Sequence, residues 1–129
     1  MSIKVAIVED DKSLLDAIAF ELEEQGYEVT KDVDGESGVE TIKNTKPDII
    51  LLDIIMPRMD GFEVLETLKK NEALQDIPVI ILSNLGHDAD VKKGIELGAK
   101  AYFIKASIDI EEMDDKIKEI LEKNDSKKE

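Results

Sequence analysis

The chain has 129 residues, close to the commonest size of one domain, which leaves little room for a second. Acidic residues outnumber Lys and Arg by 31 to 17, and the net charge of −14 argues against a nucleic-acid partner, whose phosphates need a basic patch. The chain has no cysteine and one histidine, His87, which excludes disulfides and histidine-rich metal clusters. It also has no long apolar run and no signal-peptide pattern, so we expect a cytoplasmic protein with no membrane partner.

The first part of the chain alternates a short apolar run with a segment of helical period. Residues 3–8 predict a strand, and the next segment keeps apolar residues on one helical face as far as Gly26, a favourable helix end. Residues 27–31 predict a short strand whose charged neighbours indicate a position at or near a sheet edge. Asp34 can then cap a second helix, which ends before Pro47.

The same alternation continues to the end of the chain. Three further strands are apolar runs without polar alternation, as expected for strands buried on both faces: 49–52, 79–82 and 101–104. Between them, Asp60 and Glu63 have the spacing of a capping box at a helix start, and residues 88–97 predict a weaker helix that contains Gly94. Ser107 is expected to cap the last helix, which has acidic residues in its first turn.

Five strands and five helices in strict alternation predict an α/β fold with a parallel sheet covered on both faces. The sequence shows no internal repeat. Residues 1–123 are expected to form the domain, and residues 124–129 a frayed polar tail.

Polar residues stand where the predicted strands end. In open α/β sheets, ligands bind outside the carboxyl ends of the strands, so these residues are expected to meet at one rim although they lie far apart in the sequence. The residues at these ends are Glu9, Asp10, Asp11, Asp53, Ser83 and Lys105.

The chemistry of this set is that of an acidic phosphoryl-transfer site. Carboxylates of Glu9, Asp10 and Asp53 placed about 5 Å apart would repel one another by roughly 3 kcal/mol per pair at an effective dielectric constant of about 20. Such a site needs a cation or a shared proton, and oxygen ligands suit Mg²⁺. Asp53 can then act as a nucleophile toward phosphorus, with Lys105 offsetting charge and the Ser83 hydroxyl donating to a phosphoryl oxygen.

With these residues the sequence resembles the response-regulator receiver family of two-component signalling over nearly its whole length, and within it the single-domain chemotaxis-type regulators. The run from Asp53 to Gly61, DIIMPRMDG, is similar to the family's acceptor loop. The resemblance implies a flavodoxin-like, doubly wound (βα)5 fold with strand order 2-1-3-4-5. It also implies a phosphoprotein that is no conventional enzyme but promotes its own phosphorylation and dephosphorylation.

The resemblance further implies a role for each matching residue. Asp53 would be the phosphoacceptor, Asp10 and Asp53 would bind Mg²⁺ directly with the backbone carbonyl of Ile55, and Glu9 would act through water. Ser83 and Tyr102 would form a switch that reshapes the face made by the fourth helix, fifth strand and fifth helix. The implied partners are a sensor histidine kinase or phosphotransfer protein and a downstream protein target, with the chain a monomer or a phosphorylation-dependent dimer.

Two features depart from the family pattern. Proline usually follows the lysine through a cis peptide bond, but here Ala106 follows Lys105, and a cis bond without proline costs roughly 2.5–4 kcal/mol. The loop therefore either carries that strain or is trans and shifted. The positions two beyond Asp53 and Ser83 are the aliphatic Ile55 and Leu85, and we hypothesise that they hinder the attacking water and prolong the phosphorylated state.

Other interpretations remain open on the sequence. Asp10 and Asp11 are also typical helix caps, and Asp60 and Gly61 are better explained as a helix start than as site residues. One alternative function is a degenerate receiver that binds partners constitutively, and a less favoured one is a phosphatase similar to the haloacid dehalogenase family, which expects a second Asp where this chain has Ile55. No output domain follows the last helix, so we expect a stand-alone regulator that acts by protein contact.

Overall fold

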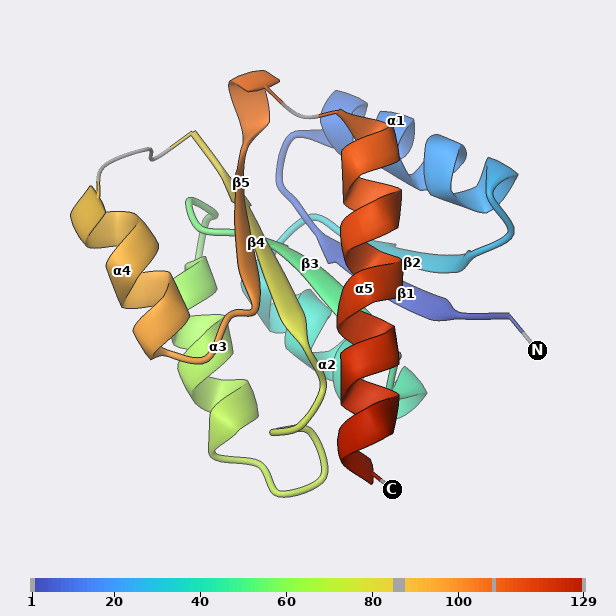
Figure 1. The fold of residues 1–129 in the computed structure, drawn as a ribbon. Helices are drawn as coiled ribbons and strands as arrows, with labels where there is room; N and C mark the ends of the chain where they lie inside the picture. The colour runs from blue at the N-terminus through green and yellow to red at the C-terminus, as the bar shows by residue number, and fades with distance from the viewer. Residues whose placement is uncertain (1, 85–87, 108, 129) are drawn as a thin grey trace.

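The computed structural model describes residues 2–84, 88–107 and 109–128. A five-stranded parallel sheet forms its centre, with the strand order β2-β1-β3-β4-β5 (Figure 1). The strands are β1 (Lys4–Val8), β2 (Glu28–Asp32), β3 (Ile49–Asp53), β4 (Val79–Ser83) and β5 (Ala101–Ile104). This confirms the predicted fold class and strand order, and it confirms β2 as an edge strand.

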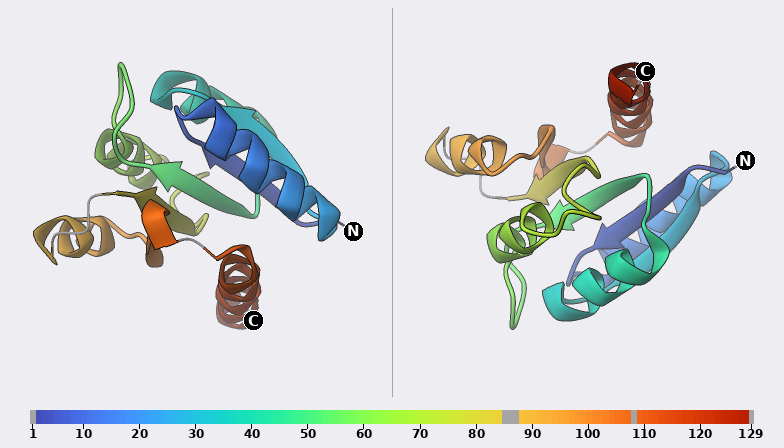
Figure 2. Two further views of the ribbon diagram at one scale, coloured as in Figure 1. Left: turned by 90° about the horizontal axis from the view of Figure 1, so that it is seen from above. Right: turned by 90° about the horizontal axis from the view of Figure 1, so that it is seen from below.

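Helices cover both faces of the sheet, as the end-on views in Figure 2 show. On one face α2 and α3 build a core with the β strands, and on the other face α1 and α5 build a second core. The helices are α1 (Lys12–Glu24), α2 (Gly35–Thr45), α3 (Gly61–Lys69), α4 (Asp88–Glu96) and α5 (Ile110–Lys128). All five residues of β3 and of β4 are buried, which explains their uninterrupted apolar runs before the strand ends.

Aspartates begin three of the helices. The carboxylates of Asp11, Asp34 and Asp60 accept hydrogen bonds from backbone N–H groups in the first turns of α1, α2 and α3. These contacts confirm the predicted caps at Asp34 and Asp60, and each satisfies an N–H group that has no partner within its helix.

The predicted cap at Ser107 is wrong. A short 3₁₀ helix, η1 (Lys105–Ser107), follows β5, and the Ser107 hydroxyl donates to the carbonyl of Ile104 behind it. Asp109 instead stands before α5, where its carboxylate accepts from the N–H of Glu111 at 2.9 Å. Because η1 occupies the residues directly after β5, α5 begins at Ile110, later than Ser107 predicted.

Helix α5 continues to Lys128, into the segment that we expected to be a frayed tail. Within the described residues, no helix has both the length and the apolar character required to cross a membrane.

A partly buried hydrogen bond ties Tyr27, the residue before β2, to α5. The Tyr27 hydroxyl donates to Asp114 Oδ1, while Asp114 Oδ2 pairs with Lys118 at 3.1 Å. Burial and then the bond to Asp114 raise the pKa of Tyr27 well above its usual range, so the hydroxyl remains a donor. We expect Tyr27→Phe to lower the free energy of unfolding by about 1–3 kcal/mol in urea denaturation, because Asp114 loses its buried donor.

Lys118→Met is the matched control for Tyr27→Phe. It removes the other partner of Asp114, but the Lys118 side chain is largely exposed, so the expected loss is below about 1 kcal/mol. An equal loss in both variants would contradict a specific role of the tyrosine hydroxyl.

Candidate functional site

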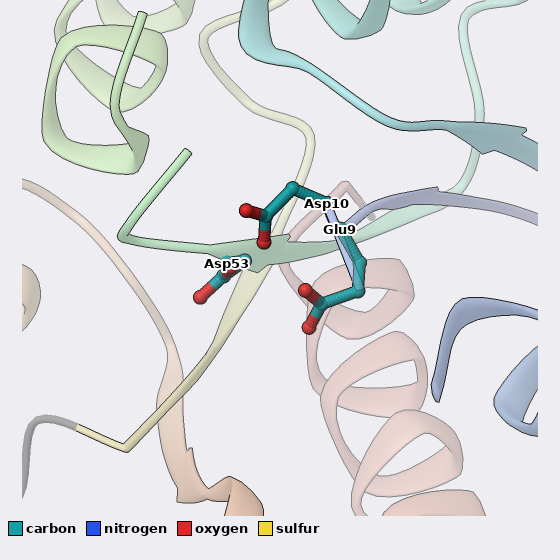
Figure 3. A group of neighbouring side chains, drawn as sticks. All are labelled: Glu9, Asp10 and Asp53. Atoms are coloured by element: carbon teal, nitrogen blue, oxygen red, sulfur yellow. The ribbon is translucent and has the colours of Figure 1, made fainter. Parts of the chain in front are cut away.

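Three carboxylates meet where β1 and β3 end. Glu9 and Asp10 follow β1, and Asp53 is the last residue of β3. One carboxylate oxygen from each lies within 4.8 Å of the others, and Figure 3 shows the side chains gathered there. Glu9 and Asp53 are buried, whereas Asp10 is exposed. β1 and β3 are parallel neighbours in the sheet, which is why residues so far apart in the sequence meet.

Asp10 and Asp11 take different roles. The Asp11 carboxylate caps α1 by accepting from Leu14 N at 3.2 Å, and its own N–H donates to Glu9 Oε2 at 3.0 Å. Asp11 therefore holds the helix start and the Glu9 carboxylate in place, while Asp10 belongs to the acidic cluster. The sequence alone left both residues as possible caps.

Lys105 brings the one positive charge that contacts this cluster within the described part of the chain. Its Nζ lies 2.7 Å from Glu9 Oε1 and 3.1 Å from Asp53 Oδ2, and the side chain is only 14% exposed. Among the described residues no peptide bond is cis, so the Lys105–Ala106 bond is trans. Of the two alternatives for this loop, the trans form is the one present, and the lysine still reaches both acids.

The charges in the site shift the pKa values of its members. Burial, followed by the charge of Glu9, raises the pKa of Asp53 from 3.8 to about 7, although the Lys105 ammonium opposes this. Burial alone would lower the pKa of Lys105, but its close contacts with the carboxylates of Glu9 and Asp53 outweigh burial and raise it. Three carboxylates face one ammonium, so two negative charges remain unbalanced when all are ionised.

The residues present fit a divalent cation. Glu9 Oε1 and Asp53 Oδ2 are buried and accept no hydrogen bond. Both lie at ion-pair distance from Lys105, whose hydrogen bond goes instead to Glu9 Oε2 at 2.9 Å. Buried carboxylate oxygens that accept no hydrogen bond are rare, because each loses its hydration, and one shared ammonium cannot balance the charge of both groups. Such oxygens, with the exposed Asp10 beside them, are the hard ligands that Mg²⁺ prefers.

Ser83 and Tyr102 lie on the neighbouring strands. Ser83 is the buried last residue of β4, next in sequence to Leu82, which pairs with Asp53 in the sheet. Burial raises the pKa of Tyr102, and a hydrogen bond with Ser83 opposes that rise. The two residues expected to form a switch are therefore in contact with each other.

The ring of Tyr102 also faces Gly94 of α4. A Cβ atom built on Gly94 would lie 3.5 Å from the ring and 2.5 Å from the Ile81 side chain. Glycine thus lets α4 approach β4 and β5 closely. This explains why Gly94 stands in a helix whose prediction it weakened.

The residue two positions after Asp53 is open to solvent. The Ile55 side chain is 60% exposed. Leu85 and His87, to which the sequence also drew attention, lie outside the described residues.

Gly61 is a positioning residue that sequence reasoning assigned only to the helix start. Its N–H donates to the Ile54 carbonyl at 2.8 Å, and a Cβ atom there would overlap the Asp53 carbonyl oxygen. Gly35 of α2 makes a similar close approach to the Met59 carbonyl in the same loop. The loop that follows Asp53 is therefore held between two glycines. In the sequence, the Asp60-Gly61 pair after a predicted strand was the only indication of this close approach.

Gly61→Ala is expected to destabilise the fold by about 1–3 kcal/mol, since the loop must shift to admit the methyl group. Because the shift begins at Asp53, the phosphoryl acceptance that the family resemblance implies for this residue should slow as well, measured as the rate of phosphoryl adduct formation. Gly26→Ala is the control: Gly26 has φ of +97° but nothing within 4 Å of a Cβ atom, so it should lose stability without changing that rate.

Comparison with known families gives one match over most of the chain. Residues 5–118 match the family described as response regulator receiver domain. The DNA-binding dual master transcriptional regulator RpaA of Synechocystis sp. is 36% identical over 122 residues, which make up 95% of this chain and 50% of that protein. The chain therefore spans about half the length of this curated relative.

Solved structures give the same result. A CheY-like response regulator receiver domain protein from Methanospirillum hungatei JF-1 superposes with a TM-score of 0.91 at 28% identity, covering 98% of this chain and 99% of that one. The receiver domain of the Francisella response regulator 1452 superposes with a TM-score of 0.88 at 30% identity, covering 95% and 98%. The fold and the chain length of these domains correspond to those found here.

Proposed function

The chain belongs to the response regulator receiver domain family, the phosphoacceptor module of two-component signalling, and we propose that its acceptor is Asp53. The supporting observation is the meeting of a buried strand-end carboxylate with two further acids and one lysine at ion-pair distance. Structural ion pairs seldom leave an excess of buried negative charge, because the desolvation is not repaid.

In the proposed reaction an Asp53 carboxylate oxygen attacks the phosphorus of a phosphohistidine on a kinase or phosphotransfer protein. An O–P bond forms while the P–N bond breaks, and the leaving imidazole nitrogen keeps the electron pair of that bond and takes a proton from water. Lys105 offsets charge on the phosphoryl oxygens, and the Ser83 hydroxyl donates to one of them. Asp10, Asp53 and the Ile55 carbonyl would hold Mg²⁺, with Glu9 acting through water, and the bound ion would supply further charge neutralisation.

The proposed output is a change of protein contact. If Ser83 turns toward a phosphoryl group, its hydrogen bond with Tyr102 is lost, and the ring that supports Gly94 of α4 can move. The face formed by α4, β5 and α5 would then change its affinity for a downstream protein or for a second copy of the chain. We place this switch in the cytoplasm with its donor.

The test is incubation of the chain with acetyl phosphate and Mg²⁺, followed by intact mass measurement. We expect one phosphoryl adduct that hydroxylamine removes, and no adduct on an Asp53→Asn variant. Complete inertness would favour the degenerate receiver. Repeated turnover of a phosphate ester such as p-nitrophenyl phosphate would favour the phosphatase.

The lifetime of the adduct tests the aliphatic residues two positions after Asp53 and Ser83 in the sequence, Ile55 and Leu85. We expect the double variant Ile55→Asn, Leu85→Glu to lose its phosphoryl group about tenfold faster, because polar groups there can orient the attacking water. Phe20→Asn is a matched control, since Phe20 is as exposed as Ile55, at 60%, but lies on α1. Equal or slower decay in the double variant would remove the hypothesis of steric hindrance by the aliphatic side chains.

A further inference from the structure

Figure 1 shows the start of β5 beside the C-terminal half of α5. Lysine side chains from these two segments line a cleft. Its volume is about 190 Å³, too small for a drug-sized ligand, which needs about 300–1,000 Å³. The residues around it are Lys100, Lys116, Glu119, Ile120, Lys123 and Asn124. We call it the lysine cleft.

The lysine cleft carries more positive than negative charge. Glu119 is its one acid, and it already pairs with Lys116 and with Lys123, each at 3.1 Å. Hydrogen bonds from these two lysines lower the pKa of Glu119. Lys100 is exposed and has no ion pair within the described part of the chain. Two positive charges are therefore left over in a chain whose net charge is −14.

A fourth lysine, Lys69, lies near Lys100. Lys69 of α3 packs its side chain under Gly98, where a built Cβ atom would lie 2.6 Å from Lys69 Cε, and its Nζ donates to the Gln75 carbonyl at 2.9 Å. Burial, followed by the charge of Lys100, lowers the pKa of Lys69, although the charge of Asp76 opposes this. Lys69 and Lys100 are thus close enough to repel each other.

From this geometry we propose that the lysine cleft binds an acidic segment of a protein partner. One or two carboxylate side chains fit its volume, Lys100 and Lys116 would pair with them, and Ile120 in its lining offers an apolar contact. A nucleic acid is disfavoured, because the chain's overall negative charge repels a long polyanion, whereas a short segment meets only the local field.

The lysine cleft is separate from the acidic site. Lys100 and Lys105 flank β5 at opposite ends, about 16 Å apart at the rise of a strand. The inference adds to the proposed function the chemistry of the segment that a downstream protein would present. It rests on the proposed function only in calling that protein a signalling partner.

The experiment measures fluorescence anisotropy of a short fluorescein-labelled peptide of alternating glutamate and leucine against the full chain at low salt. We expect saturable binding that weakens about tenfold in the double variant Lys100→Gln, Lys116→Gln. The control is Lys31→Gln, Lys43→Gln, which removes the same charge from exposed lysines on β2 and α2 and should change affinity less than about twofold. Circular dichroism checks that each variant folds.

The outcomes separate this inference from its competitors. Lack of binding overturns the inference. Equal weakening in both double variants also overturns it, because the net charge of the chain rather than the cleft would then determine the affinity for the peptide. Tighter, Lys100-dependent binding of a labelled oligonucleotide would assign the cleft to nucleic acid instead. Phosphoryl adduct formation should be unchanged in the Lys100→Gln, Lys116→Gln variant, so a failed adduct test and a failed peptide test point to different proposals.

Discussion

Lys105→Met is expected to destabilise the metal-free chain by about 3 kcal/mol near pH 8 and by much less near pH 5. Methionine keeps the length and the packing of the side chain but removes the ammonium that contacts Glu9 and Asp53. Breaking a buried ion pair from one side costs about 3–5 kcal/mol, because it leaves a buried charge uncompensated. At low pH the loss shrinks, since Asp53, with its pKa of about 7, takes up a proton.

Urea denaturation in EDTA at the two pH values measures this effect. Lys31→Met serves as the control, because Lys31 pairs with Asp16 at the same 3.1 Å but both side chains are about half exposed. Its loss should stay below about 1 kcal/mol and should not depend on pH in this range. A pH-independent loss in Lys105→Met would mean that the lysine stabilises the fold by packing alone. Mg²⁺ should restore part of the stability of Lys105→Met.

The fold was predictable from the sequence because its strands and helices follow simple patterns. β3 and β4 are buried on both faces, and their apolar runs end in Asp53 and Ser83, so the last residue of each strand was identifiable even though it is polar. The strand order β2-β1-β3-β4-β5 came from the family resemblance rather than from periodicity, and the structure confirms it.

Details that depend on contacts distant in sequence were beyond prediction. A one-residue offset separates the cap Asp11 from the cluster residue Asp10, and either aspartate fits both roles in the sequence. Serine is a common residue at a helix start, but Ser107 lies instead in the 3₁₀ helix η1, whose first residue, Lys105, contacts Glu9. Gly61 has an ordinary helix-start context, and only the folded chain brings the Asp53 carbonyl against it.

Asp53→Asn is expected to stabilise the metal-free chain at neutral and higher pH while abolishing phosphorylation. Burial and the neighbouring Glu9 disfavour the charged form of Asp53, which is why its pKa is about 7 in the folded chain. A carboxyl group whose pKa is raised by folding binds more protons folded than unfolded between the two values. The stability that Asp53 contributes in its protonated form is therefore lost as the pH rises from about 4 to about 7.

An uncharged amide of the same shape avoids that loss. The stability difference between Asp53→Asn and the unchanged chain should be near zero at about pH 4, grow through the neutral range and level off above it at about 2–4 kcal/mol, since one pKa unit corresponds to about 1.4 kcal/mol. Thermal unfolding across this range in EDTA measures it, with the exposed Asp16→Asn as control. Mg²⁺ should then raise the unfolding temperature of the unchanged chain more than that of Asp53→Asn, because the cation relieves the same repulsion that the amide removes. A variant less stable than the unchanged chain at neutral pH would show instead that the ion pair with Lys105 outweighs burial and the charge of Glu9.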